Sequence, residues 1–562
     1  MSALYVDERK PGCNGFHLQK DFIYFTPNDT DRSTNGSAWR LVASGDNLVE
    51  KYKVLTGDLV QLRYSAASPP VPAAATPPAS PGGRRMLSDA PVDPIDPIDP
   101  GLDGIDVLTG DLVQLRYSAA SPPVPAAATP PASPGGRRML SDAPVDPIDP
   151  IDPGLDGIDV LSATEGHEIY TGETIRVKSM VYILSMCGWP ASMTVEVRWG
   201  GAAQRLFFTG SSNIKDYTSS CSYGKSVYEP TENFIVGNID VNCSGTVASG
   251  SLKYAYDSST KCDAAEQFAW RLAGDAAGRA AGYGDFMDNS LRRRIIMILP
   301  REVKCQWAGL GSVGCGGRFC TVYIKGSTQG DIGVYFHELG HTQGLSHAGK
   351  GLVEYGDTSD VMGDDGSSTQ GYLCTNSGNM FRIGWNAPLA SLSPALTNIA
   401  SNMGVPGRWL LPATSAADVN FVALNYSFVG VPFPNLFISF RVRADSYDNI
   451  LSSSNNNRVF VHVFNGTASD RDYNRTNLVA TLSSGGIYRS GFADTRGRQD
   501  AGGGVRVSVL SINTGVSATI QLCRFTELVE TNCEDTIDND CNGLTDAEDP
   551  ACRATRSPQL NL

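Results

Sequence analysis

The segment HELGHTQGLSH, which starts at His337, constrains this chain more than any other feature of its sequence. His337 and His341 are four residues apart, so on a helix they stand on one face and can hold a single metal ion. Glu338 lies beside them, where a carboxylate can take a proton from a water molecule and return it to a leaving group. Gly344 tolerates the left-handed backbone that ends a helix, which lets His347 approach from the following loop as a third ligand.

Three histidine ligands predict a catalytic metal site, because they leave the fourth position of a tetrahedral zinc ion open for water. A zinc ion held in this way lowers the pKa of its water to about 7 and polarises a carbonyl group. A bare HExxH pattern is often an ordinary surface helix, but the extended pattern fixes five positions and contains half of the six histidines. The sequence therefore predicts a zinc site with Glu338 as the general base.

Segments around this site resemble known proteases. Met362, in DTSDVMGDD, follows the third histidine at the place where the metzincin clan carries a methionine in a turn beneath the metal. A methionine that only fills the core is the alternative. Several longer segments resemble the gametolysin family of M11 peptidases, secreted proteases of volvocine green algae: CSYGKSVYEP, RRRIIMILP, CQWAGLGSVGCGGRFC, VYFHELGHTQGLSHAG, EYGDTSDVMG and IGW.

This resemblance implies an α+β metzincin-like domain and a zinc metalloendopeptidase. The substrates it implies are proline- and hydroxyproline-rich glycoproteins of the cell wall or extracellular matrix. The alternative is a catalytically silent matrix protein that keeps a relic of the protease fold. An intact Glu338 disfavours that alternative, since a relic has no reason to retain the base.

Composition and cysteine content indicate a secreted protein. The net charge of -14 argues against nucleic acid as a partner, and no stretch is apolar enough to span a membrane. Thirteen cysteines and six Asn-X-Ser/Thr triplets suit an extracellular glycoprotein, although the first residues contain no apolar core of a secretory signal. The odd cysteine count leaves one unpaired, and Cys13 and Cys187 are the candidates.

The amino-terminal third contains a duplication. Residues 54–106 recur without change as residues 107–159. Each copy contains a proline-rich stretch and an acidic stretch broken by prolines, both of which should lack a packed core. We expect a pro-region segment at 1–53, a disordered linker at 54–159 and a β-rich pro-region at 160–205.

The remaining segments predict a catalytic domain at 206–392. Residues 262–282 should form the long helix behind its sheet, and residues 295–299 and 320–324 should form strands. Asp331 should cap the active-site helix. Beyond it, short alternating runs predict a β-sandwich at 393–525, in which His462 is structural.

A second metal site is predicted in the cysteine- and aspartate-rich tail, residues 526–562. Oxygen ligands fall at alternate positions of an EF-hand-like loop with Gly543 at its sharp turn, a pattern that suits Ca²⁺. The candidate ligands are Asp538, Asp540, Asn542, Asp546 and Asp549. No flanking helices are evident, and an acidic tail without an ion is the alternative.

Overall fold

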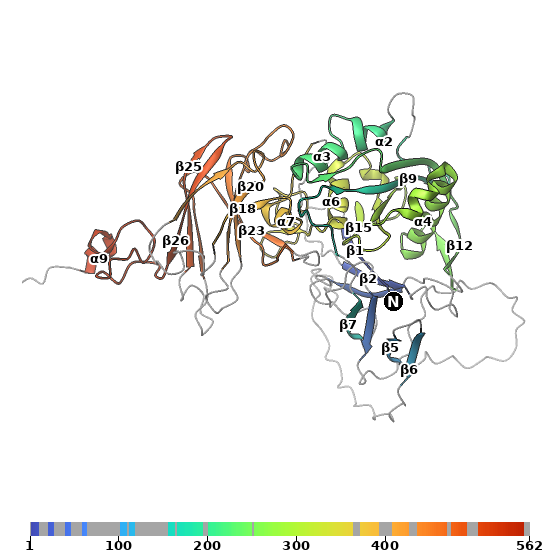
Figure 1. Ribbon diagram of the computed structural model, residues 1–562, viewed down its shortest axis with the longest axis horizontal. Helices are drawn as coiled ribbons and strands as arrows, with labels where there is room; N and C mark the ends of the chain where they lie inside the picture. Colours follow the sequence, from blue (N-terminus) through green and yellow to red (C-terminus); the bar gives the residue numbers. More distant parts are fainter. Residues whose placement is uncertain are drawn as a thin grey trace, which may run out of the picture.

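The computed structural model describes residues 166–194, 201–249, 252–363, 371–392, 407–425, 435–468, 474–491 and 504–555, together with the backbone of seven strands nearer the amino terminus. It is a mixed α/β structure with several sheets, as the family resemblance implies. Figure 1 shows helices and a mixed sheet at one end, and the strands of the carboxy-terminal part at the other.

The central sheet holds four neighbouring parallel strands and one antiparallel strand. The order is β11 (Asn233–Val241), β9 (Lys178–Met186), β14 (Arg293–Ile298), β16 (Phe319–Ile324) and the antiparallel β15 (Gly309–Ser312). β14 and β16 lie where the sequence predicts strands. Two separate two-stranded sheets lie beside it. One pairs β8 (Ile175–Arg176) with β10 (Ser226–Val227), and the other pairs β12 (Ser244–Ser249) with β13 (Leu252–Asp257).

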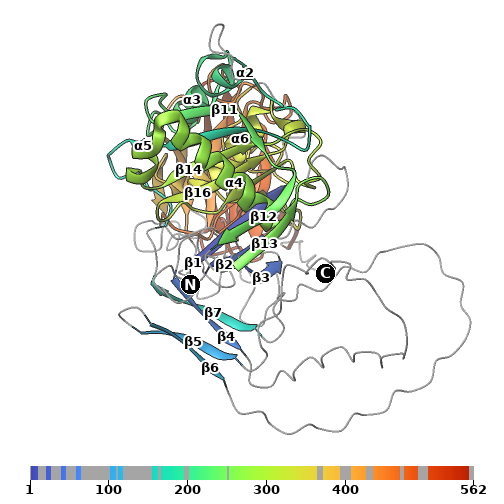
Figure 2. The same cartoon turned by 90° about the vertical axis from the view of Figure 1, so that its right-hand side faces the viewer.

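Helices cover both faces of this sheet. α6 (Ile332–Thr342) and α3 (Ile214–Cys221) lie on one face, and α4 (Ala264–Gly278) lies on the other, which is turned toward the viewer in Figure 2. α4 is the long helix expected within residues 262–282. Shorter helical pieces are α2 (Ala202–Gln204), η2 (Arg205–Thr209), η3 (Arg279–Tyr283), α5 (Gly284–Asn289), η4 (Gly326–Thr328) and α7 (Ser377–Arg382).

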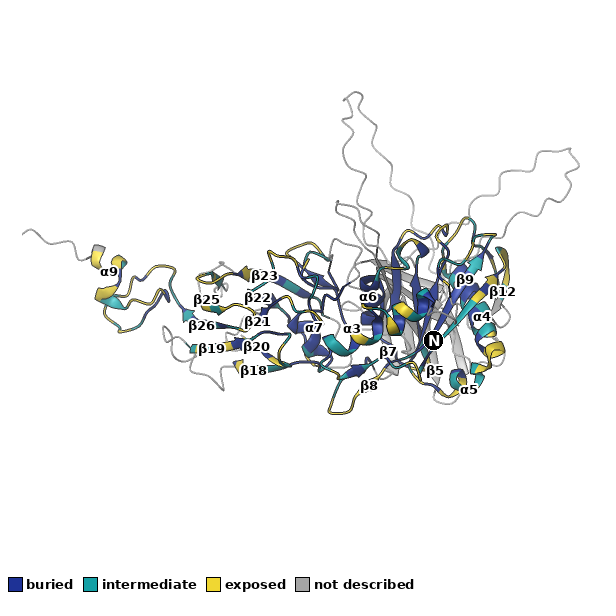
Figure 3. Ribbon diagram, turned by 90° about the horizontal axis from the view of Figure 1, so that it is seen from above, coloured by how far each residue is buried: buried dark blue, intermediate teal, exposed yellow. Residues whose placement is uncertain are grey.

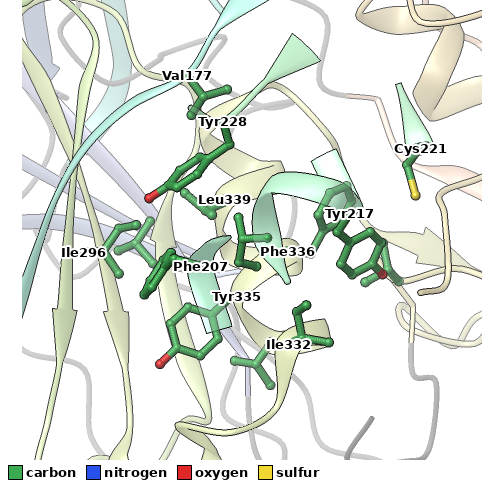
Figure 4. Close-up of a cluster of buried hydrophobic side chains, with 14 of the residues drawn as sticks. Val177, Phe207, Tyr217, Cys221, Tyr228, Ile296, Ile332, Tyr335, Phe336 and Leu339 are labelled. Atoms are coloured by element: carbon green, nitrogen blue, oxygen red, sulfur yellow. The ribbon is translucent and has the colours of Figure 1, made fainter. Parts of the chain in front are cut away.

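Alternate residues of the central strands enter two separate cores, as the two-residue period of a strand requires. On β9, Val181 packs with Phe336 of α6, whereas Tyr182 packs with Trp270 of α4. Phe336 also stacks on Tyr217, with ring centroids 3.9 Å apart. Figure 4 shows this aromatic cluster around α6. Burial of each such side chain stabilises the fold by about 1.5–3 kcal/mol, so the active-site helix is firmly held.

The expected pro-region at 160–205 contains a strand of the central sheet. β9 lies between β11 and β14 in the central sheet, and its residues from 179 to 184 are buried. The run VYILSM is a continuous apolar stretch, which is typical of a parallel strand buried on both faces. Cys187, one of the two candidates for a free thiol, is bonded to Cys243. Cys13 lies outside the described residues.

The amino-terminal strands extend the central sheet. β1 (Ser2–Arg9) pairs antiparallel with β15, and β2 (Asp21–Thr26) and β3 (Arg40–Gly45) follow it. The expected disordered linker at 54–159 contains strands near its ends and at its middle, because LVQLRY and LDGIDVL alternate apolar and polar residues. These strands are β4 (Leu59–Tyr64), β5 (Leu102–Leu108), β6 (Leu112–Tyr117) and β7 (Leu155–Ser162). The proline-rich stretches lie outside the described residues.

The carboxy-terminal part contains two sheets that share one core. Six strands form the order β17 (Ala348–Gly349), β23 (Thr476–Leu482), β22 (Arg458–Val463), β21 (Leu436–Arg441), β20 (Val419–Leu424) and β18 (Ala387–Leu392). Four form the order β19 (Gly407–Pro412), β26 (Ser517–Phe525), β25 (Gly504–Asn513) and β24 (Ile487–Gly491). β17 and β18 come from the expected catalytic range, so a boundary at 392 does not separate the two parts.

Disulfides occur in both parts of the molecule. Besides Cys187–Cys243, the bonds are Cys221–Cys374, Cys262–Cys305, Cys315–Cys320, Cys523–Cys541 and Cys533–Cys552. Figure 3 shows buried residues running through the strands of both parts, with exposed residues on the helices and loops. Among the described helices, none has the length and apolar character needed to cross a bilayer.

Candidate active site

The helix α6 carries the HELGH segment within the core. Asp331 caps it as predicted, since its side chain accepts a hydrogen bond from the backbone N–H of Gly333 at 3.0 Å. Gly344 follows the helix with φ +98°, the left-handed conformation expected there. The chain turns at this glycine and brings His347 back toward the helix.

The three predicted histidines converge. One ring nitrogen from each of His337, His341 and His347 lies within 4.8 Å of the others. Nε2 of His337 and Nε2 of His341 are 3.1 Å apart. All three side chains are at most 2% exposed, so the cluster is shielded from bulk water.

The outer nitrogen of each imidazole has an acceptor. Nδ1 of His337 lies 2.8 Å from the carbonyl oxygen of Val361, and Nδ1 of His341 lies 3.1 Å from that of Leu345. Nδ1 of His347 lies 2.6 Å from Oε1 of Glu354. An Nδ1–H that donates to such a partner fixes the tautomer and leaves the Nε2 lone pair for a metal. The donor set therefore fits zinc.

Met362 lies in a turn directly beneath the helix. The N–H of Gly363 donates to the carbonyl of Asp360 at 2.9 Å, which closes the turn. Met362 is fully buried, and a Cβ added to Gly340 of α6 would stand 3.0 Å from its sulfur. The same turn presents the Val361 carbonyl to His337, so it positions a ligand as well as filling space.

Glu338 lies between α6 and β15. Its side chain is 1% exposed, and two glycines of β15 make room for it. A Cβ on Gly309 would stand 2.5 Å from Oε1 of Glu338, and a Cβ on Gly311 would stand 2.9 Å from Oε2. Any larger residue at these positions would displace the carboxylate.

Sequence reasoning missed Glu354, Tyr355 and Arg475. Glu354 accepts from His347, and Nη2 of Arg475 lies 2.5 Å from the same Oε1. The hydroxyl of Tyr355 lies 2.9 Å from Nε2 of His347, on the metal-facing side of the ring. The first two follow closely after the third histidine within EYGDTSD, a signal that was available. Arg475 lies far from the histidines in the sequence, and no local sequence pattern pointed to it.

A buried pair of side chains supports the same loop. Nε2 of His462, in β22, lies 2.8 Å from Oδ2 of Asp357, and both side chains are fully buried. Burial opposes ionisation of Asp357, but His462 and Ser359 outweigh it and hold the pKa of this carboxyl below its usual value. Burial, together with the charge of Asp357, raises the pKa of Asp360 to about 6. The expectation that His462 is structural agrees with this packing.

The tail brings only some of its predicted ligands together. Carboxylate oxygens of Asp538 and Asp540 cluster with one from Glu530, which the sequence analysis missed. The amide of Asn542 contacts Asp540 at 3.2 Å and also Asp549. Asp546 instead accepts hydrogen bonds from the backbone N–H groups of residues 535 and 536. Burial raises the pKa of Glu530 and of Asp538.

Comparison with known proteins extends the likeness over most of the chain. The profile of the gametolysin peptidase M11 family matches residues 176–494. An autolysin from Chlamydomonas reinhardtii is 32% identical over 459 residues, which cover 69% of this chain and 71% of the relative. The profile match starts near β9 and continues into the carboxy-terminal sheets. The chain therefore belongs to the gametolysin family of M11 peptidases.

Proposed function

We propose that this protein is a secreted zinc metalloendopeptidase that hydrolyses proline- and hydroxyproline-rich glycoproteins of the cell wall or extracellular matrix. The observation that carries the proposal is the convergence of His337, His341 and His347, each with its Nδ1 anchored. The autolysin relative supports a wall protein as the substrate.

Each residue of the site has its own role in peptide hydrolysis. His337, His341 and His347 would hold the metal through Nε2. A bound zinc ion would lower the pKa of a water molecule and polarise the scissile carbonyl. Glu338 would take a proton from the attacking water and then donate it to the leaving amine. The buried position of Glu338 excludes competing solvent and strengthens these electrostatic interactions.

We propose that the amino-terminal segment keeps the enzyme latent. β15 carries the glycines beside Glu338, and β1 pairs antiparallel with it from Val6 opposite Ser312 to Arg9 opposite Gly309. An extended peptide substrate would use the same backbone groups of this strand. Removal of the segment before residue 166 would therefore free the strand for substrate.

The remaining parts are assigned as follows. We propose that the peptidase domain starts near β8 and β9, that the two carboxy-terminal sheets form a β-sandwich joined to it, and that the tail binds Ca²⁺. Asp538, Asp540 and Glu530 supply carboxylates, and Asn542 and Asp549 lie beside them. Hard oxygen ligands of this kind suit calcium rather than zinc.

The test uses the full chain and the chain cleaved ahead of residue 166, each as wild type and as Glu338→Gln. Digestion of a wall glycoprotein is measured together with bound zinc. We expect the cleaved wild type to digest it, and Glu338→Gln to bind zinc normally but to be about 10²–10⁴-fold slower. Zinc binding without digestion by the cleaved wild type would instead support the silent matrix protein.

A further inference from the structure

The loop that follows His347 is part of the carboxy-terminal sheet. Its first two residues form β17, which pairs in parallel with β23, so that Ala348 lies opposite Thr476. The N–H of Thr476 donates to the carbonyl of His347 at 3.2 Å. Asn477 then exchanges two hydrogen bonds with the backbone of Gly351, at 2.9 and 3.1 Å. The backbone of the third metal ligand is thus held by a strand that lies about 130 residues later.

The side chain of His347 depends on the same sheet. Oε1 of Glu354 lies 2.6 Å from Nδ1 of His347 and 2.5 Å from Nη2 of Arg475, the residue that precedes β23. The side chains of Glu354 and Arg475 are 15% and 26% exposed, so their pairing is partly shielded. A carboxylate between an imidazole N–H and a guanidinium has one favoured orientation, since each charge-assisted bond has a preferred geometry.

The partner of Nδ1 is of a different kind in His347 than in the other two histidines. His337 and His341 donate to backbone carbonyls of Val361 and Leu345, which lie in the peptidase segment itself. Among the described contacts of the three Nδ1 atoms, that of His347 is made with a side chain, Glu354. The orientation of Glu354 relies in turn on the other part of the molecule.

Two further strands of this sheet contact the same loop. Arg441, at the end of β21, donates from Nη1 to the carbonyl of Ser359 at 2.6 Å. His462, in β22, binds Asp357. Arg441, His462 and Arg475 come from or directly precede three neighbouring strands, and each is basic. The sheet therefore contacts the loop between the third ligand and Met362 at several points.

We infer that the carboxy-terminal sheet positions the third ligand of the metal site. Arg475 acts as a positioning residue that orients His347 through Glu354. This inference rests on the proposed zinc function. The range matched by the family, residues 176–494, contains both parts of the molecule and extends past Arg475.

The test compares full-length wild type with Glu354→Gln, Arg475→Met, Arg475→Lys and the double variant Glu354→Gln/Arg475→Met. The readout is the zinc dissociation constant, measured by competition with a coloured chelator, and the melting temperature of the metal-free protein is recorded beside it. Arg408→Met is the matched control, because Arg408 is an exposed arginine of β19 in the other sheet. Substitution of Arg475 leaves the Asn474–Thr476 glycosylation triplet intact.

We expect Glu354→Gln to raise the dissociation constant about 10- to 100-fold, as loss of a partner of a metal-binding histidine does. Arg475→Met should raise it about 3- to 10-fold, because the carboxylate remains but loses its fixed orientation. Arg475→Lys should recover part of the loss, and Arg408→Met should match wild type. The double variant should be no weaker than Glu354→Gln alone, because both residues act through one path.

Three results would overturn the inference. One is an unchanged zinc affinity in Arg475→Met, and another is an additive loss in the double variant. The third is a lower melting temperature with unchanged affinity, which would show a merely structural role. Failure of the wild type to bind zinc would be a different result, since it would remove the proposed function itself.

Discussion

The two candidate metal sites of this protein are built in different ways. The histidine site lies between a helix and a sheet that share extensive cores, and its ligands are at most 2% exposed. The acidic loop of the tail has a core of only Cys523, Phe525 and Cys541, and the disulfides Cys523–Cys541 and Cys533–Cys552 hold it. A small segment cannot bury enough apolar surface, so the two disulfides stabilise the tail in place of packing.

This difference predicts opposite consequences of metal loss. The histidine site should keep its shape without its ion, because its imidazoles are held by protein acceptors. The acidic loop should loosen without its ion, because its gathered carboxylates then repel one another. Each prediction below tests one side of this contrast.

The largest expected effect is that of zinc removal from the cleaved protein. A zinc-selective chelator should lower activity more than about 100-fold, since the metal supplies several kcal/mol of transition-state stabilisation. The circular dichroism spectrum should stay the same. A collapse of the spectrum would show that the ion, and not packing, builds the histidine site.

The substitution Gly309→Ala should have the second-largest effect on activity. The added Cβ would stand 2.5 Å from Oε1 of Glu338, so the carboxylate must move. A displacement of about 1 Å in a catalytic group costs on the order of 100-fold in rate. Gly330→Ala is the control, because a Cβ there meets nothing within 4 Å. Equal kcat/KM values for both variants would contradict the close fit between β15 and Glu338.

Loss of the Cys533–Cys552 disulfide should affect the tail alone. The bond closes a loop of 19 residues, and its removal in Cys533→Ser/Cys552→Ser should cost about 3 kcal/mol of local stability. Hydrogen exchange should speed up within residues 526–555, and added Ca²⁺ should slow it again. Protease activity should not change, and a parallel loss of activity would show that the two sites are coupled.

The smallest expected effect is a loss of folding stability at acidic pH. Burial, with help from Arg382, lowers the pKa of His167, which packs over Gly344, to about 3. Between pH 6.5 and about 3 the unfolded chain binds a proton at His167 that the folded chain does not, so stability falls as the pH falls. The slope is about 1.4 kcal/mol per pH unit.

Urea unfolding at pH 7 and pH 5 measures this slope. Replacement of the imidazole in His167→Leu should reduce the difference in unfolding free energy between the two pH values. An equal pH dependence in wild type and variant would assign the acid sensitivity to other groups, among them the three metal-binding histidines.

Local features of the site were predictable from the sequence. The cap at Asp331, the helix, the turn at Gly344 and the order of the histidines all depend on residues close together in the chain. The short alternating runs within residues 393–525 likewise contain strands, because alternation is a local signal. The sequence predicts a β-rich segment in the range that contains β9, but periodicity does not say which strands are neighbours, so only the structure places β9 between β11 and β14.

The sequence by itself determined the chemistry at the metal: three imidazoles, one carboxylate and the helix that spaces them. Only the tertiary structure decided what surrounds them. Gly309 beside Glu338, β1 on the edge of β15, and Arg475 behind Glu354 are contacts between segments far apart in the chain. Such contacts depend on how sheets pack and pair, and local helix or strand preferences contain no record of that pairing.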